Sequence, residues 1–173
     1  AKMTSTVDVI TGGRLVLGLG TGDSLSRDEL TSFGYGFPTL DERVGRLKET
    51  ILILRALWTK DEASFKGKYY NLSHAANWPK PKQSPHPPIW VGGKHRKILD
   101  AIAESADGWN YWGLGREKLS QLNNYLSAKC TDFGRDPERI VKSWSGTFSH
   151  IFRTTKSHSK KVDNILSYLR NHA

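Results

Sequence analysis

Apolar residues along this chain recur with two different periods, which predicts helices that alternate with strands. After Thr39 and Asp41, either of which can cap a helix, five apolar side chains follow at steps of three and four: Val44, Leu47, Ile51, Leu54 and Trp58. This spacing places all five on one face of a long helix, so we expect that face to pack on the core.

Weaker patterns predict five further helices. Residues 1–10 carry Met3, Val7 and Ile10 at helical spacing and are followed by two glycines, which commonly end a helix. The remaining four are expected at residues 27–32, in the segment that contains Ile98, Ala101, Ile102 and Ala103, at residues 118–129 and at residues 159–172.

Short apolar runs between these helices predict buried strands. They occur at residues 14–20, 88–91 and 107–111, and a fourth strand is expected within residues 140–152. Strands that alternate with helices form right-handed βαβ units and a parallel sheet, so the predicted fold class is α/β. We expect a single domain that spans residues 1–173.

Three segments depart from this alternation. Residues 63–72 alternate about Gly67, which predicts a small hairpin, and residues 77–88 contain five prolines, which predicts an extended segment. Residues 21–38 form a polar, glycine-containing loop directly after the first predicted strand. Because α/β enzymes keep binding and catalytic residues in such loops, this one is the first place to search for a site.

Length and composition limit the classes of protein to which the chain can belong. At 173 residues, 37% of them hydrophobic, it can bury one moderate core, yet it is shorter than the roughly 250 residues of a complete eight-stranded barrel. Its apolar runs are too short to cross a bilayer, so we expect a soluble protein without a membrane partner. A single cysteine, Cys130, excludes an internal disulfide and fits a cytoplasmic location.

The formal net charge of +9 raises the question of an acidic partner. Much of the excess positive charge is local. The C-terminal stretch contains one acidic residue, Asp163, and five of its basic residues are Arg153, Lys156, Lys160, Lys161 and Arg170. Basic patches that bind nucleic acid are interleaved with aromatic residues or accompany a recognition motif, and neither is present. We therefore do not expect nucleic acid as a partner.

The end of the first predicted strand carries glycines beside a hydroxyl and a carboxylate, in the run Gly18-Leu19-Gly20-Thr21-Gly22-Asp23. Glycines let a backbone approach a bound ring or phosphate closely. The run lacks the third glycine and the later acidic residue of a dinucleotide fingerprint, so NAD binding is not expected. A tight turn without a ligand is the alternative that spacing leaves open.

The end of the second predicted strand is also rich in glycine, and basic residues follow it. Here Gly92 and Gly93 lead into a helix that begins beside Lys94, His95 and Arg96. Backbone N–H groups, the helix dipole and adjacent cations together suit a phosphate. A glycine turn with solvated basic residues is the alternative.

Other common catalytic arrangements do not occur in the sequence. The six histidines are scattered singly, without the paired spacing of metal ligands, so no metal site is expected. No Gly-x-Ser-x-Gly elbow is present either, which argues against a serine hydrolase.

Several blocks, taken in order, resemble the luciferase-like monooxygenase family and in particular its F420-dependent oxidoreductase branch. They are TGGRLVLGLGTG at 11–22, FGYGFPTLDERVGRLKETILILRALW at 33–58, FKGKYYNL at 65–72, NWPKPKQSPHPPIWVGG at 77–93 and SADGWNYWG at 105–113. The resemblance implies a (β/α)₈ TIM barrel, of which this chain supplies an incomplete set of parallel strands with flanking helices.

The resemblance also implies coenzyme F420, with FMN as the alternative, and hydride transfer to or from a small organic substrate. In the similar F420 enzymes a Thr-Gly-Glu sequence follows the strand. Thr21 and Gly22 match it as cofactor-binding residues, whereas Asp23 replaces the catalytic Glu with a side chain one methylene shorter. Ser26 stands where such enzymes carry a cofactor-binding Asn.

Further site residues follow from the same resemblance. Gly92 and Gly93 match a phosphate-binding pair, and His95 and Arg96 lie where its helix begins, so all four are expected to bind the cofactor. Trp109 and Trp112 follow the next strand and are expected to wall the substrate pocket, with ordinary packing at its rim as the alternative.

By the family pattern, the chain begins just before the fourth barrel strand and ends one strand early. A partial barrel leaves apolar edges, so we expect a homo-oligomer or a barrel-completing chain to cover them. Three interpretations stay open: a fragment of a longer enzyme, a half-barrel that completes itself by oligomerising, and a degenerate member that binds without catalysing.

Overall fold

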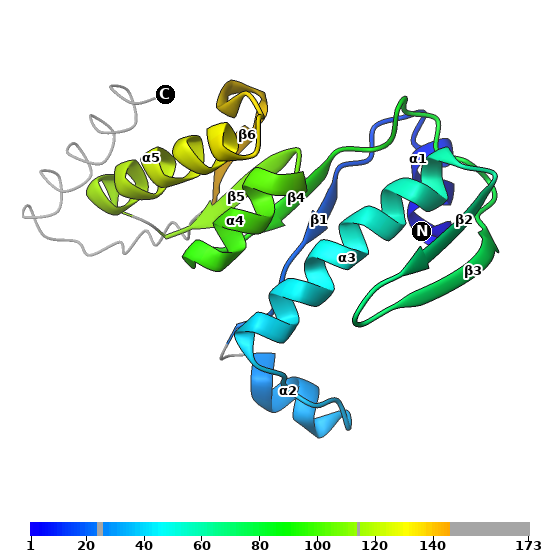
Figure 1. Cartoon of the computed structure of the whole chain (residues 1–173), viewed down its shortest axis with the longest axis horizontal. Coiled ribbons are helices and arrows are strands. Elements are labelled where there is room, and N and C mark those ends of the chain that lie inside the picture. The colour runs from blue at the N-terminus through cyan, green and yellow to red at the C-terminus, as the bar shows by residue number, and fades with distance from the viewer. Residues whose placement is uncertain (24–25, 114, 146–173) are drawn as a thin grey trace, which may run out of the picture.

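The computed structural model describes residues 1–23, 26–113 and 115–145 of the chain (Figure 1). Its centre is a sheet of four parallel strands, in the order β1 (Leu17–Leu19), β4 (Ile89–Gly92), β5 (Gly108–Trp112) and β6 (Val141–Ser145). The predicted parallel α/β sheet is confirmed. β1 is shorter than the predicted residues 14–20, because pairing with the four-residue β4 spans three positions of β1.

Three helices lie along one face of this sheet: α3 (Leu40–Thr59), α4 (Arg96–Ser105) and α5 (Arg116–Asp132) (Figure 1). The two shorter helices, α1 (Lys2–Ile10) and α2 (Ser26–Ser32), flank β1 in the chain, and a 3₁₀ turn, η1 (Pro137–Arg139), leads into β6. The Thr39 hydroxyl caps α3 as predicted, since its Oγ1 accepts a hydrogen bond of 3.3 Å from Glu42 N. The helix predicted at 159–172 lies outside the described residues.

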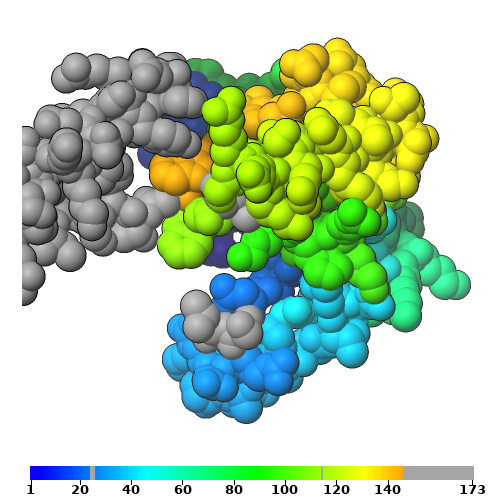
Figure 2. Space-filling view, turned by 90° about the vertical axis from the view of Figure 1, so that its left-hand side faces the viewer, coloured from blue at the N-terminus to red at the C-terminus, as the bar shows by residue number. Residues whose placement is uncertain are grey.

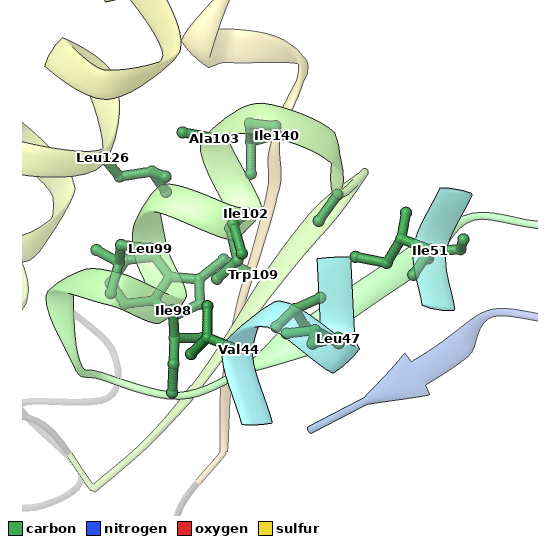
Figure 3. Packing of buried hydrophobic residues seen from close by; sticks show 14 of the residues in the cluster. Val44, Leu47, Ile51, Ile98, Leu99, Ile102, Ala103, Trp109, Leu126 and Ile140 are labelled. Atoms are coloured by element: carbon green, nitrogen blue, oxygen red, sulfur yellow. The ribbon is translucent and has the colours of Figure 1, made fainter. Parts of the chain in front are cut away.

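The hydrophobic core lies between the sheet and these helices. The buried residues of α3 are the five that the sequence predicts, namely Val44, Leu47, Ile51, Leu54 and Trp58. They belong to one cluster with Ile98, Leu99 and Ile102 of α4 and with Trp109 of β5 (Figure 3). The apolar face predicted for α4 is buried in full, which explains why a helix of ten residues is stable in this position.

The two faces of the sheet differ in character because side chains alternate along each strand. Ile89, Val91 and Trp109 point into the core, towards the helices. Their neighbours along the strands point to the opposite side, which we call the open face. In register across the sheet, this face carries Gly18 beside Trp90 and Gly108, and then Gly92 beside Asn110 and Ser143.

Asp107, at the start of β5, joins three elements. Its Oδ2 accepts a hydrogen bond of 2.9 Å from Ile89 N, and its Oδ1 lies 2.9 Å from Nη2 of Arg55 on α3. Its backbone also bonds Ile89 O and Val141 N. The carboxylate thereby fixes how β4, β5 and α3 meet.

α1 is a helix as predicted, but the residues that it buries are polar. Met3 and Ile10, whose spacing predicts the helix, are 84% and 78% exposed, whereas Ser5 and Asp8 are fully buried. The Asp8 carboxylate accepts hydrogen bonds from Leu15 N, Lys82 N, Gln83 N and Gln83 Nε2 at 2.7–3.2 Å. Polar anchoring to the proline-rich segment, rather than apolar burial, therefore sets the orientation of α1.

The predicted hairpin is confirmed as the antiparallel pair β2 (Glu62–Lys66) and β3 (Asn71–Ala76). It lies alongside α3 (Figure 1). The Glu49 carboxylate of α3 holds its turn, accepting hydrogen bonds from the backbone N–H groups of Lys68, Tyr69 and Tyr70 at 2.7–3.3 Å. Across the described ranges, no helix combines the length and apolar character needed to span a bilayer.

Candidate functional site

The two glycine-rich segments lie side by side at the carboxyl end of the sheet. Leu19 of β1 is in register with Val91 of β4, so the chain leaves both strands at the same level. The loop with Thr21, Gly22 and Asp23 follows β1, and Gly93 follows β4 directly. Barrels of parallel strands hold ligands at this end, because their loops converge there.

The loop after β1 is held by contacts that involve Gly22 and Asp23. Gly22 adopts a φ of 72°, which favours glycine. Oδ1 of Asp23 accepts hydrogen bonds from the backbone N and from Oγ of Ser26, at 3.0 and 3.1 Å, at the start of α2. The structure thus brings the predicted catalytic Asp23 and the predicted cofactor-binding Ser26 into direct contact. Thr21 Oγ1 lies 3.4 Å from Gly22 O.

Arg43 of α3 supports the same loop, although sequence reasoning did not single it out. Its Nη1 donates to Gly22 O at 3.3 Å, and its guanidinium lies 4.0 Å above the centre of the Phe37 ring. Arg27 lies over the same ring at 5.0 Å. The Nε of Arg43 is buried without a hydrogen-bond partner among the described residues. Two cations and one aromatic ring therefore hold the loop near the start of α3.

A hollow of about 220 Å³ adjoins this loop. It lies between the end of β1, α3 and the hairpin, and its lining is both polar and apolar: Leu19, Gly20, Thr21, Arg43, Arg46, Leu47, Thr50 and Tyr70. In Figure 2 the α2 segment (blue) projects away from the segments that follow β4 and β5 (green and yellow-green). α3 (cyan) lies between α2 and these segments.

The glycines after β4 serve different purposes. Gly93 has a φ of 143°, and a Cβ on it would come within 2.8 Å of Ile98 Cδ1, so the turn into α4 requires glycine. Gly92 is less confined, because a Cβ there would meet only the backbone oxygens of Leu19 and Asn110, at 3.9 and 4.0 Å. Gly93 therefore allows the turn from β4 into α4, and Gly92 leaves the open face free of a side chain at this position.

The basic residues at the start of α4 make contacts within the protein. His95 caps the helix, and its Nδ1 accepts a hydrogen bond of 3.2 Å from Lys97 N, which assigns the proton of a neutral ring to Nε2. Arg96 lies over the Tyr125 ring at 4.9 Å, and Lys97 forms an ion pair with Asp41 of α3. The expected cations are present, but Arg96 is directed towards α5.

The two predicted substrate-pocket tryptophans occupy different environments. Trp109 has no exposed surface, and its Nε1 donates to Gly93 O at 2.7 Å. The β5 register places it beside Val91 in the core, so in this structure it supports the Gly93 turn from below and does not line an open pocket. Trp112 lies at the end of β5, 63% exposed, on the same side of the strand as Asn110.

A polar cluster on the open face was missed by sequence reasoning. Asn110 Nδ2 donates to Ser143 Oγ at 2.7 Å, and Ser145 Oγ donates to Asn110 Oδ1 at 3.3 Å. Below it, Trp90 lies across Gly108, where a Cβ would come within 2.5 Å of the indole. Only the strand register brings these residues together, so no local motif reveals the cluster.

Comparisons with known proteins place this geometry in a family. The family described as luciferase-like monooxygenase matches residues 1–160. The chain is 38% identical over 165 residues to an F420-dependent glucose-6-phosphate dehydrogenase of Amycolatopsis mediterranei (strain U-32), covering 95% of this chain and 47% of that protein. It is 36% identical over 162 residues to an FMNH(2)-dependent dimethylsulfone monooxygenase of Pseudomonas putida, and this match covers 94% of this chain and 43% of that protein. The chain thus spans less than half the length of these two relatives.

Solved structures show the same fold at lower sequence identity. An F420-dependent secondary alcohol dehydrogenase in complex with an F420-acetone adduct is similar with a TM-score of 0.73 and 21% identity, over 83% of this chain and 42% of that one. The coenzyme F420 dependent tetrahydromethanopterin reductase of Methanopyrus kandleri is similar with a TM-score of 0.72 and 21% sequence identity. The match covers 84% of this chain and 44% of that one. The described strands are therefore part of a TIM-barrel fold, and the chain belongs to the luciferase-like monooxygenase family.

Proposed function

We propose that this chain forms part of the cofactor-binding end of an oxidoreductase that uses coenzyme F420, or FMN, to transfer hydride to or from a small organic substrate. The observation that carries the proposal is the juxtaposition of the Thr21-Gly22-Asp23 loop and the Gly92-Gly93 turn at the ends of adjacent parallel strands. The names of the relatives, which specify F420 and FMNH(2) dependence, support this class of cofactor.

The residues present fit a flat heteroaromatic ring with a phosphate-bearing chain. A Cβ on Gly18 or Gly20 would meet no atom within 4 Å, and Gly92 adds only backbone oxygens at that distance. These glycines leave the face and end of two strands uncovered by side chains, which allows a ring to approach the backbone. The start of α4, directly after Gly93, offers N–H groups and a helix dipole to an anion.

The predicted site residues of the loop after β1 and of the turn after β4 have distinct tasks in this proposal. The bound flavin or deazaflavin ring supplies the hydride chemistry. The Thr21 hydroxyl and the Gly22 backbone contact the ring, and Ser26 holds the carboxylate of Asp23 at the start of α2. Gly92, Gly93 and the α4 start, with His95, bind the phosphate, and Arg96 joins them by turning away from the Tyr125 ring. Asp23 holds the proton that accompanies transfer to or from the substrate.

The short side chain of Asp23 favours one alternative, a protein that binds the cofactor without turning substrate over. Because Oδ1 of Asp23 already accepts two hydrogen bonds from Ser26, proton delivery to the point that a longer Glu reaches requires a shift of the loop or of the substrate. In this alternative Asp23 only caps α2. The two proposals agree on cofactor binding and differ in turnover.

Cofactor fluorescence provides the test. We expect the full chain to quench or shift the fluorescence of F420 or of FMN on titration, and a lack of response to both would refute the proposal. Gly92→Val should weaken the binding at least tenfold with little change in stability, since its side chain occupies ligand space. Gly36→Ala, in the loop before α3, is the control.

Turnover then separates the enzyme from the non-catalytic protein. If Asp23 holds the transferred proton, Asp23→Ala should lower kcat by about 10²–10⁴-fold with less change in cofactor affinity. Asp23→Glu restores the side chain found in similar enzymes and should retain or raise kcat. Asp28→Ala, an exposed acid on α2, is the matched control. Equal turnover in all forms would leave Asp23 with the capping role alone.

A partner for the sheet edges is the second part of the proposal. Within the described residues β1 and β6 are the outer strands, and the chain spans less than half of its relatives. We propose that a second copy or another chain completes the barrel, and that the small-molecule substrate binds in the completed assembly. The chain folds as one domain in this proposal.

A further inference from the structure

The open face of the sheet carries a polar cluster with no assigned role, formed by Asn110, Ser143 and Ser145. These side chains come from adjacent strands and lie on one side because Asn110 is in register with Ser143, and Trp112 with Ser145. The bonds at 2.7 and 3.3 Å fix the orientation of the Asn110 amide, with its nitrogen on Ser143 and its oxygen on Ser145. An oriented amide between two hydroxyls is an arrangement that can recognise a specific partner.

The side chains of the cluster have hydrogen-bond donors and acceptors that their mutual bonds do not use. A carboxamide has two N–H donors and a carbonyl that accepts two bonds, and each serine hydroxyl donates one bond and accepts two. The bond to Ser143 uses one donor of Asn110, and the bond from Ser145 uses one lone pair. Part of the capacity of each group therefore remains available for an incoming oxygen atom.

The chemistry of the cluster is neutral. Its hydrogen bonds join an amide to two hydroxyls, and the charged neighbour on β6, Lys142, points to the other face because strand side chains alternate. A carboxylate or a phosphate is better matched by arginine, lysine or a helix N-terminus. A hydroxyl or carbonyl oxygen, which exchanges one or two bonds with amides and hydroxyls, fits these residues better.

The cluster also borders the uncovered strand end. Asn110 is in register with Gly92, and neighbouring strands lie about 4.8 Å apart, so the amide is within reach of a small molecule that rests over Gly92. Trp112, 63% exposed on the same side of β5, offers an apolar surface to the rest of such a molecule. One polar anchor beside one aromatic surface is a common design for binding a small organic compound.

We propose that Asn110, Ser143 and Ser145 bind the hydroxyl or carbonyl oxygen of a small neutral substrate, an alcohol or its ketone. This proposal rests on the proposed function in placing the bound molecule beside the cofactor. Binding of the oxygen itself needs no cofactor, so the two proposals can be tested separately.

Matched probes of one shape provide the test. Dissociation constants of cyclohexanol, cyclohexanone and chlorocyclohexane are measured on the full chain by ligand-detected NMR, with and without F420 or FMN. We expect the alcohol and the ketone to bind about tenfold more tightly than the chloride. Asn110→Leu, which keeps the side-chain size, should abolish that preference, whereas Lys142→Ala, on the opposite face of β6, should keep it.

Each outcome decides the proposal. No preference in the unaltered chain, or a preference that survives Asn110→Leu, overturns it. If circular dichroism shows that Asn110→Leu does not fold, the double variant Ser143→Ala with Ser145→Ala replaces it and should reduce the preference at least threefold. A preference observed without any binding of F420 or FMN supports the oxygen site and counts against the proposed cofactor.

Discussion

Single carboxylates hold distant segments of this chain together by accepting backbone hydrogen bonds. Asp8 joins α1 to the proline-rich segment, Glu49 joins α3 to the hairpin turn, and Asp107 joins β5 to β4 and α3. Each ionised group satisfies donors that regular secondary structure leaves unpaired. At the residue scale the fold therefore depends on a few charged acceptors as well as on its core.

Asp8 gives a prediction about stability. Burial alone would raise the pKa of Asp8, but the hydrogen bonds from Gln83, Leu15 and Lys82 hold it below its ordinary value. Asp8→Asn turns an amide towards these donors and should lower the free energy of unfolding by about 3 kcal/mol. Urea unfolding at neutral pH measures the loss, and Asp61→Asn, at an exposed position, should change it by less than about 0.5 kcal/mol.

The pH dependence of the same variant follows from the sign of the shift. A carboxyl whose pKa is lowered in the folded state stabilises it fully above its ordinary pKa of about 3.9, and this contribution disappears as the pH falls through the lowered folded value. The difference in stability between the unaltered chain and Asp8→Asn should be constant near neutrality and shrink in acid. A difference that stays constant down to pH 2 would contradict this assignment.

At the scale of elements, helices were predictable from their own residues and strand ends were not. The period of α3 identified its five buried positions, because an apolar stripe and a capping threonine are local features. β1 pairs over three residues only, since its length depends on β4. α1 was predicted as a helix, but its buried face was not, because Asp8 meets its partners 74 and 75 residues later.

In the candidate site, too, some residues were predictable from local sequence and others were not. Thr21, Gly22, Gly92 and Gly93 follow strands, which a sequence pattern can detect, and their position at the sheet end follows from parallel order. The cluster around Asn110 depends on register across β5 and β6, and hydrogen bonds over 33 and 35 positions leave no local signal. The burial of Trp109 also depends on register.

Contact between α3 and the hairpin provides a prediction at this scale. A Cβ on Gly45 would come within 2.5 Å of the Tyr69 ring, so Gly45→Ala should cost more in packing than the roughly 1 kcal/mol that it gains in helix propensity. We expect a net loss of about 1 kcal/mol in urea unfolding. In the Tyr69→Ala background the same change should be stabilising, and a loss of equal size there would disprove the clash.

At the scale of the whole molecule, apolar surface is unevenly covered. α1 exposes Met3, Val7, Val9 and Ile10, and Val16 just before β1 is 46% exposed. Val16 directly precedes the outer strand β1, and α1 comes before it in the chain. Exposed apolar side chains and unpaired outer strands are both common places for another chain to bind.

Self-association should therefore depend on this surface. We expect the mass from light scattering to rise with protein concentration, and the double variant Met3→Lys with Ile10→Lys to shift that rise to at least tenfold higher concentration. Phe133→Lys, at the end of α5 and 45% exposed, alters a comparable apolar side chain away from α1 and is the control. A constant monomer mass for all three proteins would exclude a second copy as the partner.

The hairpin of β2 and β3 has a consequence for engineering and for divergence. Its turn is fastened to α3 through Glu49, and Tyr70 at the end of that turn lines the same hollow as Leu19 and Thr21 at the end of β1. Its strands pair with each other and share no ladder with the parallel sheet. An exchange or insertion in the turn would therefore also change the wall of the hollow beside the Thr21 loop. Variation in the hairpin turn can thus reshape this hollow while the parallel sheet stays unchanged.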